Sequence, residues 1–320
     1  MRPIFKYLAA ASAILLATAA GAQQKFTVLL DWHVNPDHGP LLVALERGYY
    51  KAAGLDVDLI APSDPNDPPR LVAAKKGDVA ISYQPQLHIQ VSKGLPLARI
   101  GTLVATPLTT LVVLRDGPIK SIADLKGKRI GYSVGGFEEA LLTAMLGKHG
   151  LTLKDVTLVN VNFSLSPSLM AGQVEAVIGA YRNFELNQME IAKRPGRAFY
   201  PEENGVPTFD ELIYVAHRDN LGDARARARL LAFLGAVEQG VQYLLNYPEE
   251  SWKLFIKGRE KELDDELNRR AWRDTVPRFT ASPAALDTQR YKRFAEFLLA
   301  HKVIDKTPPV STYAVDLGAQ

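Results

Sequence analysis

Aromatic and polar side chains gather at four places along the chain where short apolar runs end. The aromatic residues are Trp32, Tyr83, Phe137, Tyr181 and Phe184, and the polar residues are Asp31, Asn35, His38, Gln84, Glu138, Asn183 and Glu185. Aromatic faces stack on flat rings, and amides and carboxylates recognise ring nitrogens. This combination predicts a binding site for a flat heterocycle.

Each of these residues also has a structural interpretation that the sequence leaves open. Trp32 could belong to the core, His38 could bond its own loop, and Phe137 could pack under its own helix. Glu138 and Glu185 could be ordinary surface acids.

Gly135 and Gly136 stand where a helix is expected to begin. Free backbone N–H groups at such a position bind acceptors or anions. Gly-Gly pairs are also common in loops, so the pair by itself is weak evidence for a site.

The motifs of the common catalytic and metal sites are missing from the sequence. The six histidines show no His-x-x-x-His spacing, and the absence of cysteine excludes disulfides, thiolate metal sites and a cysteine nucleophile. The chain contains no Gly-x-Ser-x-Gly elbow, P-loop or dinucleotide fingerprint. We therefore expect no catalytic residue, no metal and no cofactor.

Strand and helix patterns alternate along most of the chain, which predicts an α/β fold with mainly parallel sheets. The expected strands are 26–30, 55–59, 79–82, 108–114, 129–132, 156–161, 176–179 and 212–216. The chain after Asp219 is expected to be helical over 224–245, 248–257, 264–272 and 288–301. Ligands of open α/β sheets bind beyond the carboxyl ends of strands, and this rule selects the loops 31–39, 83–86, 133–138 and 181–185.

An internal echo relates the two halves of the chain. A helix, Gly77, Asp78, a strand and Tyr83 are matched by a helix, Gly172, Glu175, a strand and Tyr181. The echo predicts two lobes joined by two crossings, with the C-terminal helices returning to the first lobe. We expect residues 23–114 and 217–320 in lobe 1 and residues 115–216 in lobe 2.

The N-terminal residues have the pattern of a signal peptide. Arg2 and Lys6 precede an apolar run that ends at Ala20, and Ala20-Gly21-Ala22 matches a cleavage site. The run is shorter than the roughly 20 residues that a membrane span needs. We expect residues 1–22 to be removed near Ala22, leaving a free periplasmic protein, because a lipid anchor requires a cysteine.

The charge pattern argues against a nucleic-acid partner. The 38 basic and 35 acidic residues nearly balance, and the basic groups are short and scattered. A nucleic-acid-binding protein normally carries a basic patch or stripe.

Three segments resemble the NMT1/THI5-like family of ABC-transporter solute-binding proteins: Leu30 to His38 (LDWHVNPDH), Gly48 to Val57 (GYYKAAGLDV) and Ser121 to Tyr132 (SIADLKGKRIGY). The first is similar to the branch that binds pyrimidines for thiamin precursor salvage. The resemblance implies a two-lobed, hinged periplasmic binding fold of type II. It also implies a ligand such as formylaminopyrimidine or hydroxymethylpyrimidine, a membrane permease as partner, and a monomer.

The resemblance also implies roles for individual residues. Trp32 would stack on the ring with Asn35 and His38 near it, Tyr83 and Gln84 would belong to the first wall, and Gly135, Gly136, Phe137 and Glu138 would form the facing loop. Tyr181, Asn183 and Glu185 match an aromatic-Asn-aromatic-Glu stretch of this branch, in which Glu185 would pair with an aminopyrimidine edge. Arg182 departs from this pattern, since another aromatic residue is expected there.

Two other functions remain as alternatives. The same fold could hold an alkanesulfonate, nitrate or another small anion, and additional Ser, Thr or Arg donors would then be expected near Gly135. The resembling eukaryotic enzymes make the pyrimidine with pyridoxal phosphate on a lysine that aligns with Tyr83, and they carry a cysteine-rich motif. Because this chain has neither feature, we expect that it is not an enzyme.

Overall fold

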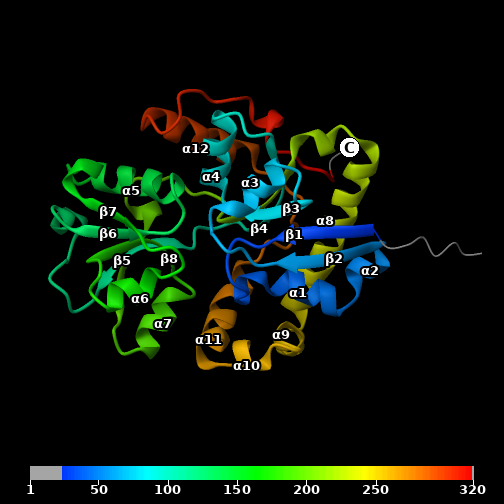
Figure 1. Ribbon diagram of the computed structural model, residues 1–320, viewed down its shortest axis with the longest axis horizontal. Helices are drawn as coiled ribbons and strands as arrows, with labels where there is room; N and C mark the ends of the chain where they lie inside the picture. The colour runs from blue at the N-terminus through cyan, green and yellow to red at the C-terminus, as the bar shows by residue number, and fades with distance from the viewer. Residues whose placement is uncertain (1–23, 319–320) are drawn as a thin grey trace, which may run out of the picture.

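The computed structural model describes residues 24–318, so the expected signal peptide lies outside the described part of the chain. Two five-stranded sheets form the centres of two lobes that lie side by side (Figure 1). The first sheet has the order β2-β1-β3-β10-β4, with β1 (Gln24–Leu29), β2 (Leu55–Ile60), β3 (Val79–Ser82), β4 (Leu97–Val104) and β10 (Leu212–His217). The second has the order β7-β6-β8-β5-β9, with β5 (Thr109–Leu114), β6 (Arg129–Tyr132), β7 (Thr157–Asn160), β8 (Ala176–Tyr181) and β9 (Gly196–Phe199).

The two sheets repeat one arrangement, which confirms the predicted α/β fold. Three strands in each sheet are parallel, and the next strand, β10 or β5, pairs antiparallel with β3 or β8. The echoed acids have equivalent roles, because Asp78 accepts a hydrogen bond from Thr27 N and Glu175 accepts one from Arg129 N, each at 2.8 Å. Tyr83 and Tyr181 therefore stand at equivalent strand ends.

Strand pairing moves both of the expected lobe boundaries. β5, which we expected in lobe 1, pairs with β8 and β9 of the second sheet. β10, which we expected in lobe 2 up to residue 216, pairs with β3 and β4 of the first sheet. We therefore place the crossings at residues 105–108 and 200–211, because backbone pairing, and not the likeness of the two strands, decides sheet membership.

Helices cover both faces of each sheet (Figure 1). Those of lobe 2 are α5 (Phe137–Gly147), α6 (Leu165–Met170) and α7 (Glu185–Ile191). Those of lobe 1 are α1 (Gly39–Glu46), α2 (Tyr49–Ala52), α3 (Asp67–Ala73), α4 (Gln84–Ser92), α8 (Ala224–Asn246), α9 (Pro248–Ile256), α10 (Glu260–Leu263), α11 (Glu266–Thr275) and α12 (Thr288–Ala300). Among the C-terminal helices, α8 and α9 contact α1, and α12 contacts α4.

The long helix α8 illustrates how the sequence builds lobe 1. Asp223 caps its first turn by accepting a hydrogen bond from Ala226 N at 2.6 Å. Its buried apolar residues recur every three or four positions, and Phe233 among them stacks on Phe26 and Tyr50 at ring distances of 5.1 and 5.9 Å. Within residues 24–318, no helix combines the length and apolarity needed to cross a membrane.

A buried carboxyl group joins the two crossings between the lobes. Glu211 on the second crossing accepts hydrogen bonds from Leu108 N at 2.6 Å and from Thr109 N at 2.9 Å, where the first crossing enters β5. Burial raises the pKa of Glu211 to about 7, against the opposing effect of these hydrogen bonds. Glu211 therefore ties the two crossings together at the hinge.

Candidate functional site

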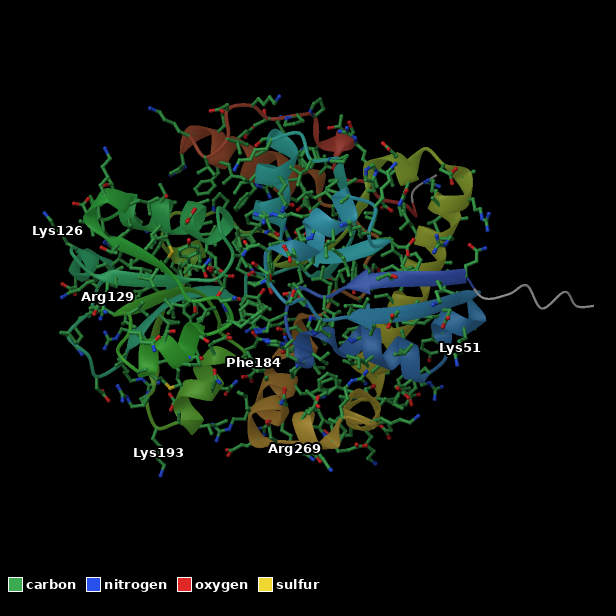
Figure 2. All side chains as sticks on the ribbon, in the orientation of Figure 1. Lys51, Lys126, Arg129, Phe184, Lys193 and Arg269 are labelled. Atoms are coloured by element: carbon green, nitrogen blue, oxygen red, sulfur yellow. The ribbon has the colours of Figure 1, made fainter. Side chains whose placement is uncertain are left out.

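A pocket lies between the two lobes, at the strand ends that the sequence selected. Lobe 1 contributes residues that follow β1 and β3, and lobe 2 contributes residues that follow β6, the first residue of α6, and residues within and after β8. The lining residues are Asp31, Trp32, Asn35, Asp37, Tyr83, Val134, Phe137, Glu138, Leu165, Gly179, Tyr181, Phe184 and Glu185. Figure 2 labels Phe184, which lies between the two lobes.

Asp31 organises the lobe 1 wall through two side chains. Its Oδ2 accepts a hydrogen bond from the Tyr83 hydroxyl at 2.9 Å, and its Oδ1 lies 3.0 Å from His38 Nε2. His38 Nδ1 accepts from Asn35 N at 3.2 Å, so Nε2 must carry the hydrogen that is donated to Asp31. His38 thus lies behind Asp31 and holds it in place.

Asp37 is the second lobe 1 carboxyl group in the pocket, and its partners come from distant parts of the chain. Asn183 Nδ2 donates to its Oδ1 at 2.7 Å and Thr275 Oγ1 donates to the same oxygen at 3.1 Å. Burial raises the pKa of Asp37 to about 6, and the hydrogen bonds from Asn183 and Thr275 oppose the shift. The loop is shaped by Asn35, whose Oδ1 accepts from Asp37 N at 2.8 Å.

Glu138 and Glu185 form the acidic part of the lobe 2 wall. Glu138 accepts a hydrogen bond from Ser133 N and Glu185 accepts one from Tyr181 N, both at 2.7 Å. Burial raises the pKa of Glu185 to about 7 and that of Glu138 well above its usual value. Both carboxyl groups therefore hold a proton more tightly than an exposed glutamate does.

Gly179 makes room for Glu138 at this wall. Its φ is +103°, and a Cβ atom built there would lie 2.5 Å from the Glu138 carboxyl carbon and even closer to Oε1. Glycine is needed at this position for both its backbone conformation and its small size.

Aromatic pairs cross between the lobes on either side of these acids. Tyr83 of lobe 1 stacks on Phe137 of lobe 2 with ring centroids 4.9 Å apart and planes inclined by 14°. Trp32 of lobe 1 meets Phe163 of lobe 2 edge to face at 4.6 Å. Phe163 also contacts His33 at 4.5 Å and so spans two residues of the opposite lobe.

The pocket is rich in acceptors and contains no basic side chain. Four of its lining residues are carboxylic acids, and none is lysine, arginine or histidine. Tyr181 adds a hydroxyl group that is buried without a hydrogen-bonding partner among the described residues. Such a lining suits a ligand that donates hydrogen bonds, and it opposes an anion by desolvation and charge repulsion.

Seven of the twelve predicted site residues line the pocket: Trp32, Asn35, Tyr83, Phe137, Glu138, Tyr181 and Glu185. The other five lie beside it. His38 is behind Asp31, Gln84 is bonded to Asp210 N at 2.8 Å, and Asn183 is bonded to Asp37. Gly135 N donates to Asn66 Oδ1 at 3.0 Å, and Gly136 N donates to Glu139, so these N–H groups are already used.

Arg182, which departs from the family pattern, points away from the pocket to the hinge. It forms an ion pair with Glu202 at 2.7 Å, and its guanidinium lies 4.4 Å from the Tyr200 ring centroid. The missing aromatic residue therefore does not change the pocket lining.

The prediction missed several lining residues, namely Asp37, Val134, Leu165 and Gly179. Asp37 lies in the selected loop between two residues that were predicted, but nothing in the sequence shows which side chains of a turn point inward. Gly179 was placed at the end of a strand without a role. Among residues 24–318, no group of three or more His, Asp or Glu residues could bind a metal ion.

Structural comparison defines the class of fold. The alkanesulfonate-binding protein of Xanthomonas axonopodis pv. citri, solved with MOPS, superposes with a TM-score of 0.71 at 17% identity, covering 92% of this chain and 99% of that one. The chain therefore has the two-lobed fold of the periplasmic solute-binding proteins.

Sequence comparison then gives the family. Residues 35–251 match the family described as NMT1/THI5 like, and the chain belongs to this family. It is 48% identical to a putative thiamine biosynthesis protein of Haemophilus influenzae, over 99% of this chain and the whole of the relative.

Two further relatives differ in what their names describe. A formylaminopyrimidine-binding protein of Halalkalibacterium halodurans is 32% identical over 75% of this chain and 72% of its own length. A 4-amino-5-hydroxymethyl-2-methylpyrimidine phosphate synthase of Schizosaccharomyces pombe is 28% identical over 77% of this chain and 72% of its own length. The family thus includes relatives named as binding proteins and relatives named as enzymes.

Proposed function

We propose that this protein is the solute-binding component of an ABC importer and that it captures an aminopyrimidine precursor of thiamin, of the formylaminopyrimidine or hydroxymethylpyrimidine type. The observation that carries the proposal is the pocket lining, which combines aromatic rings with four buried carboxyl groups and no basic side chain. An aminopyrimidine is flat and donates hydrogen bonds from its amino group, so it matches both properties.

The acidic lining argues against the alternative of a sulfonate or nitrate ligand. An anion would have to be desolvated beside Asp31, Asp37, Glu138 and Glu185, with no cation in the lining to compensate. The glycine N–H groups at the start of α5 are engaged by Asn66 and Glu139 and are not free for an anion.

We also propose that the protein binds its ligand without transforming it. A synthase that works through a Schiff base requires an amine at the site, and no lysine lines this pocket. Tyr83 is held by Asp31 at the position where the resemblance places that lysine. Pyridoxal phosphate, an anion, does not fit the acidic lining, so its addition should produce no absorbing Schiff base.

Export and delivery complete the proposal. We propose that residues 1–22 direct the chain to the periplasm, where it acts as a monomer, and that the closed lobes present the ligand to permease subunits in the inner membrane. The solute-binding fold and the signal-like N-terminal pattern support this assignment.

Mass spectrometry of molecules that co-purify with the mature protein tests the proposed ligand class directly. We expect a small aminopyrimidine, released when the protein is denatured. Recovery of a sulfonate, or of a pyrimidine phosphate formed during incubation with pyridoxal phosphate, would contradict the proposal.

A further inference from the structure

The structure brings Asn183 to a three-way junction that lies next to the pocket. Asn183 follows β8 in lobe 2, Asp37 lies in the 3-10 turn η1 (Pro36–His38) of lobe 1, and Thr275 is the last residue of α11. Asn183 Nδ2 donates hydrogen bonds to Asp37 Oδ1 and to Thr275 Oγ1, each at 2.7 Å. Since Thr275 also donates to Asp37, the three side chains form a closed ring of hydrogen bonds.

This junction is fully removed from solvent. Asn183 is 1% exposed, Asp37 is 2% exposed and Thr275 is completely buried. Charge-assisted hydrogen bonds in such surroundings are stronger than those on a surface. The two hydrogen bonds from Asn183 can form only when lobe 2 has closed on lobe 1, because Asn183 belongs to lobe 2 while Asp37 and Thr275 belong to lobe 1.

A second pair of side chains supports the same junction. Asn187 on α7 donates to the backbone oxygen of Asn183 at 2.9 Å and to Asp274 Oδ2 on α11 at 2.7 Å. Asn187 therefore braces Asn183 and also ties lobe 2 to the helix that carries Thr275.

The other contacts between lobe 1 and lobe 2 in the described part of the chain include no hydrogen bond to a carboxyl group that lines the pocket. Asn66 bonds to the backbone of Ser133 and Gly135 near the surface, and the aromatic pairs are apolar. Within residues 24–318, Asn183 of lobe 2 donates a hydrogen bond across the lobes to Asp37, a carboxyl group that lines the pocket.

We propose that Asn183 and Thr275 are positioning residues that form a closure latch: they clamp the pocket carboxyl group of Asp37 when the lobes close and thereby slow ligand release. This inference rests on the proposed function as a hinged binding protein. It assigns to Asn183 a role in closure in place of the ligand contact that the family resemblance implies.

Single-molecule energy transfer measures lobe closure in this chain without interference, since the sequence contains no cysteine. Dyes on Lys51→Cys and Lys126→Cys report the distance between the lobes, because these exposed residues lie at opposite ends of the molecule (Figure 2). Formylaminopyrimidine is the probe ligand, and stopped-flow dilution gives its dissociation rate.

We expect Asn183→Ala to lower the closed fraction and to speed ligand dissociation roughly tenfold, with association little changed. Thr275→Val should act in the same direction with a smaller effect, and it provides a second variant if Asn183→Ala fails to fold. Asn246→Ala is the matched control, because Asn246 makes one local hydrogen bond on the exposed side of α8, to Gln242 O at 2.7 Å. It should change neither quantity.

The Asn183→Asp variant distinguishes a latch from a merely structural role, because only a latch makes lobe closure in this variant depend on pH. It replaces the two donors by a carboxylate facing Asp37, so it should hold the lobes open at neutral pH and let them close on acidification, when two carboxyl groups can share a proton. The other charged or titratable groups around Asp37 are Asp31 and His38 from its own loop, Glu185 and Tyr181 from lobe 2, and Asp274 from α11.

Three results would overturn the latch. They are a closed fraction and a dissociation rate in Asn183→Ala equal to those of the unaltered protein, an Asn183→Asp variant whose closure ignores pH, and weaker binding with unchanged closure. The last result would make Asn183 a direct ligand contact through Oδ1, which has no partner among the described residues. If the unaltered protein does not bind the pyrimidine, the proposed function fails, and the closed fractions of the free proteins still decide the latch.

Discussion

The two walls of the pocket hold their carboxyl groups in different ways. On the lobe 1 wall, Asp31 and Asp37 are bonded by side chains, namely His38, Tyr83, Asn183 and Thr275. On the lobe 2 wall, Glu138 and Glu185 accept hydrogen bonds from backbone N–H groups at the ends of β6 and β8, namely those of Ser133 and Tyr181.

This difference suggests that the two walls of the pocket have different roles, one in ligand recognition and the other in lobe closure. The lobe 2 acids are fixed by secondary structure, so they keep their places whether the lobes are open or closed. Asp37 on the lobe 1 wall completes its hydrogen bonds only with lobe 2 in place, so it responds to closure. The comparison predicts that lobe 2 sets what the pocket recognises and that lobe 1 sets how the pocket closes.

The largest expected effect comes from breaking the lobe 2 wall with Gly179→Ala. The new Cβ atom would collide with the Glu138 carboxyl group at a backbone φ that disfavours alanine, so we expect a loss of about 3 kcal/mol in the free energy of unfolding together with loss of ligand binding. Urea denaturation and calorimetry measure both.

Gly172→Ala is the matched control for this variant. Gly172 also has a positive φ, of +71°, but its Cβ atom would meet nothing within 4 Å. It should cost only about 1–2 kcal/mol and leave binding intact. Equal effects of the two substitutions would show that the contact with Glu138 is unimportant.

A somewhat smaller effect is expected on the lobe 1 wall from Asp31→Ala. The change leaves His38 Nε2 and the Tyr83 hydroxyl without their buried acceptor, which should cost about 2–3 kcal/mol of unfolding free energy. The exposed Asp58 on β2 of the same lobe provides the control, and Asp58→Ala should change stability little. A near-neutral Asp31→Ala would mean that side-chain bonding does not hold this wall.

Acidification should raise the free energy of unfolding of the closed protein. The contribution of Glu185 in lobe 2 should be larger than that of Asp37 in lobe 1. The pKa of Glu185 is raised to about 7 and that of Asp37 to about 6, so each folded-state carboxyl group binds its proton more tightly than in the unfolded chain. Their contribution to stability is therefore complete at low pH and is lost as the pH rises through these values.

Thermal unfolding at about pH 5.5 and about pH 8 tests this prediction, and Glu185 and Asp37 together should contribute a difference on the order of 2 kcal/mol, in addition to the contribution of the same sign from Glu211. Glu185→Gln should reduce the pH dependence of the unfolding free energy more than Asp37→Asn does. A melting temperature that rises from the lower to the higher pH in the unaltered protein would contradict the assignment of these groups.

The sequence predicted the strand ends that carry the pocket better than it predicted the other elements around them. The echo from Gly77 to Tyr83 and from Gly172 to Tyr181 located two equivalent strand ends, because strand periodicity and glycine stops are local signals. The strand β4 and the helices α4 and α7 were not predicted. β4 is buried along its whole length and so lacks alternation, and α4 is buried on nearly every side and so lacks a polar face.

The details of the pocket that the sequence could not give share one physical cause, which is side-chain direction in irregular segments. Asn35, Asp37 and His38 occupy one tight turn, yet the first two line the pocket and His38 points behind Asp31. The cross-lobe contact between Trp32 and Phe163 joins residues far apart in the chain, and only the closed arrangement of the lobes reveals it.

The central claim is that an acid-lined, aromatic pocket selects a hydrogen-bond-donating ring over an anion. Isothermal titration of the mature protein with formylaminopyrimidine and, in a separate run, with methanesulfonate tests it most directly. The account predicts micromolar or tighter binding of the pyrimidine, abolished in Glu185→Ala, and no heat from the sulfonate. Tight binding of the sulfonate with none of the pyrimidine would contradict it.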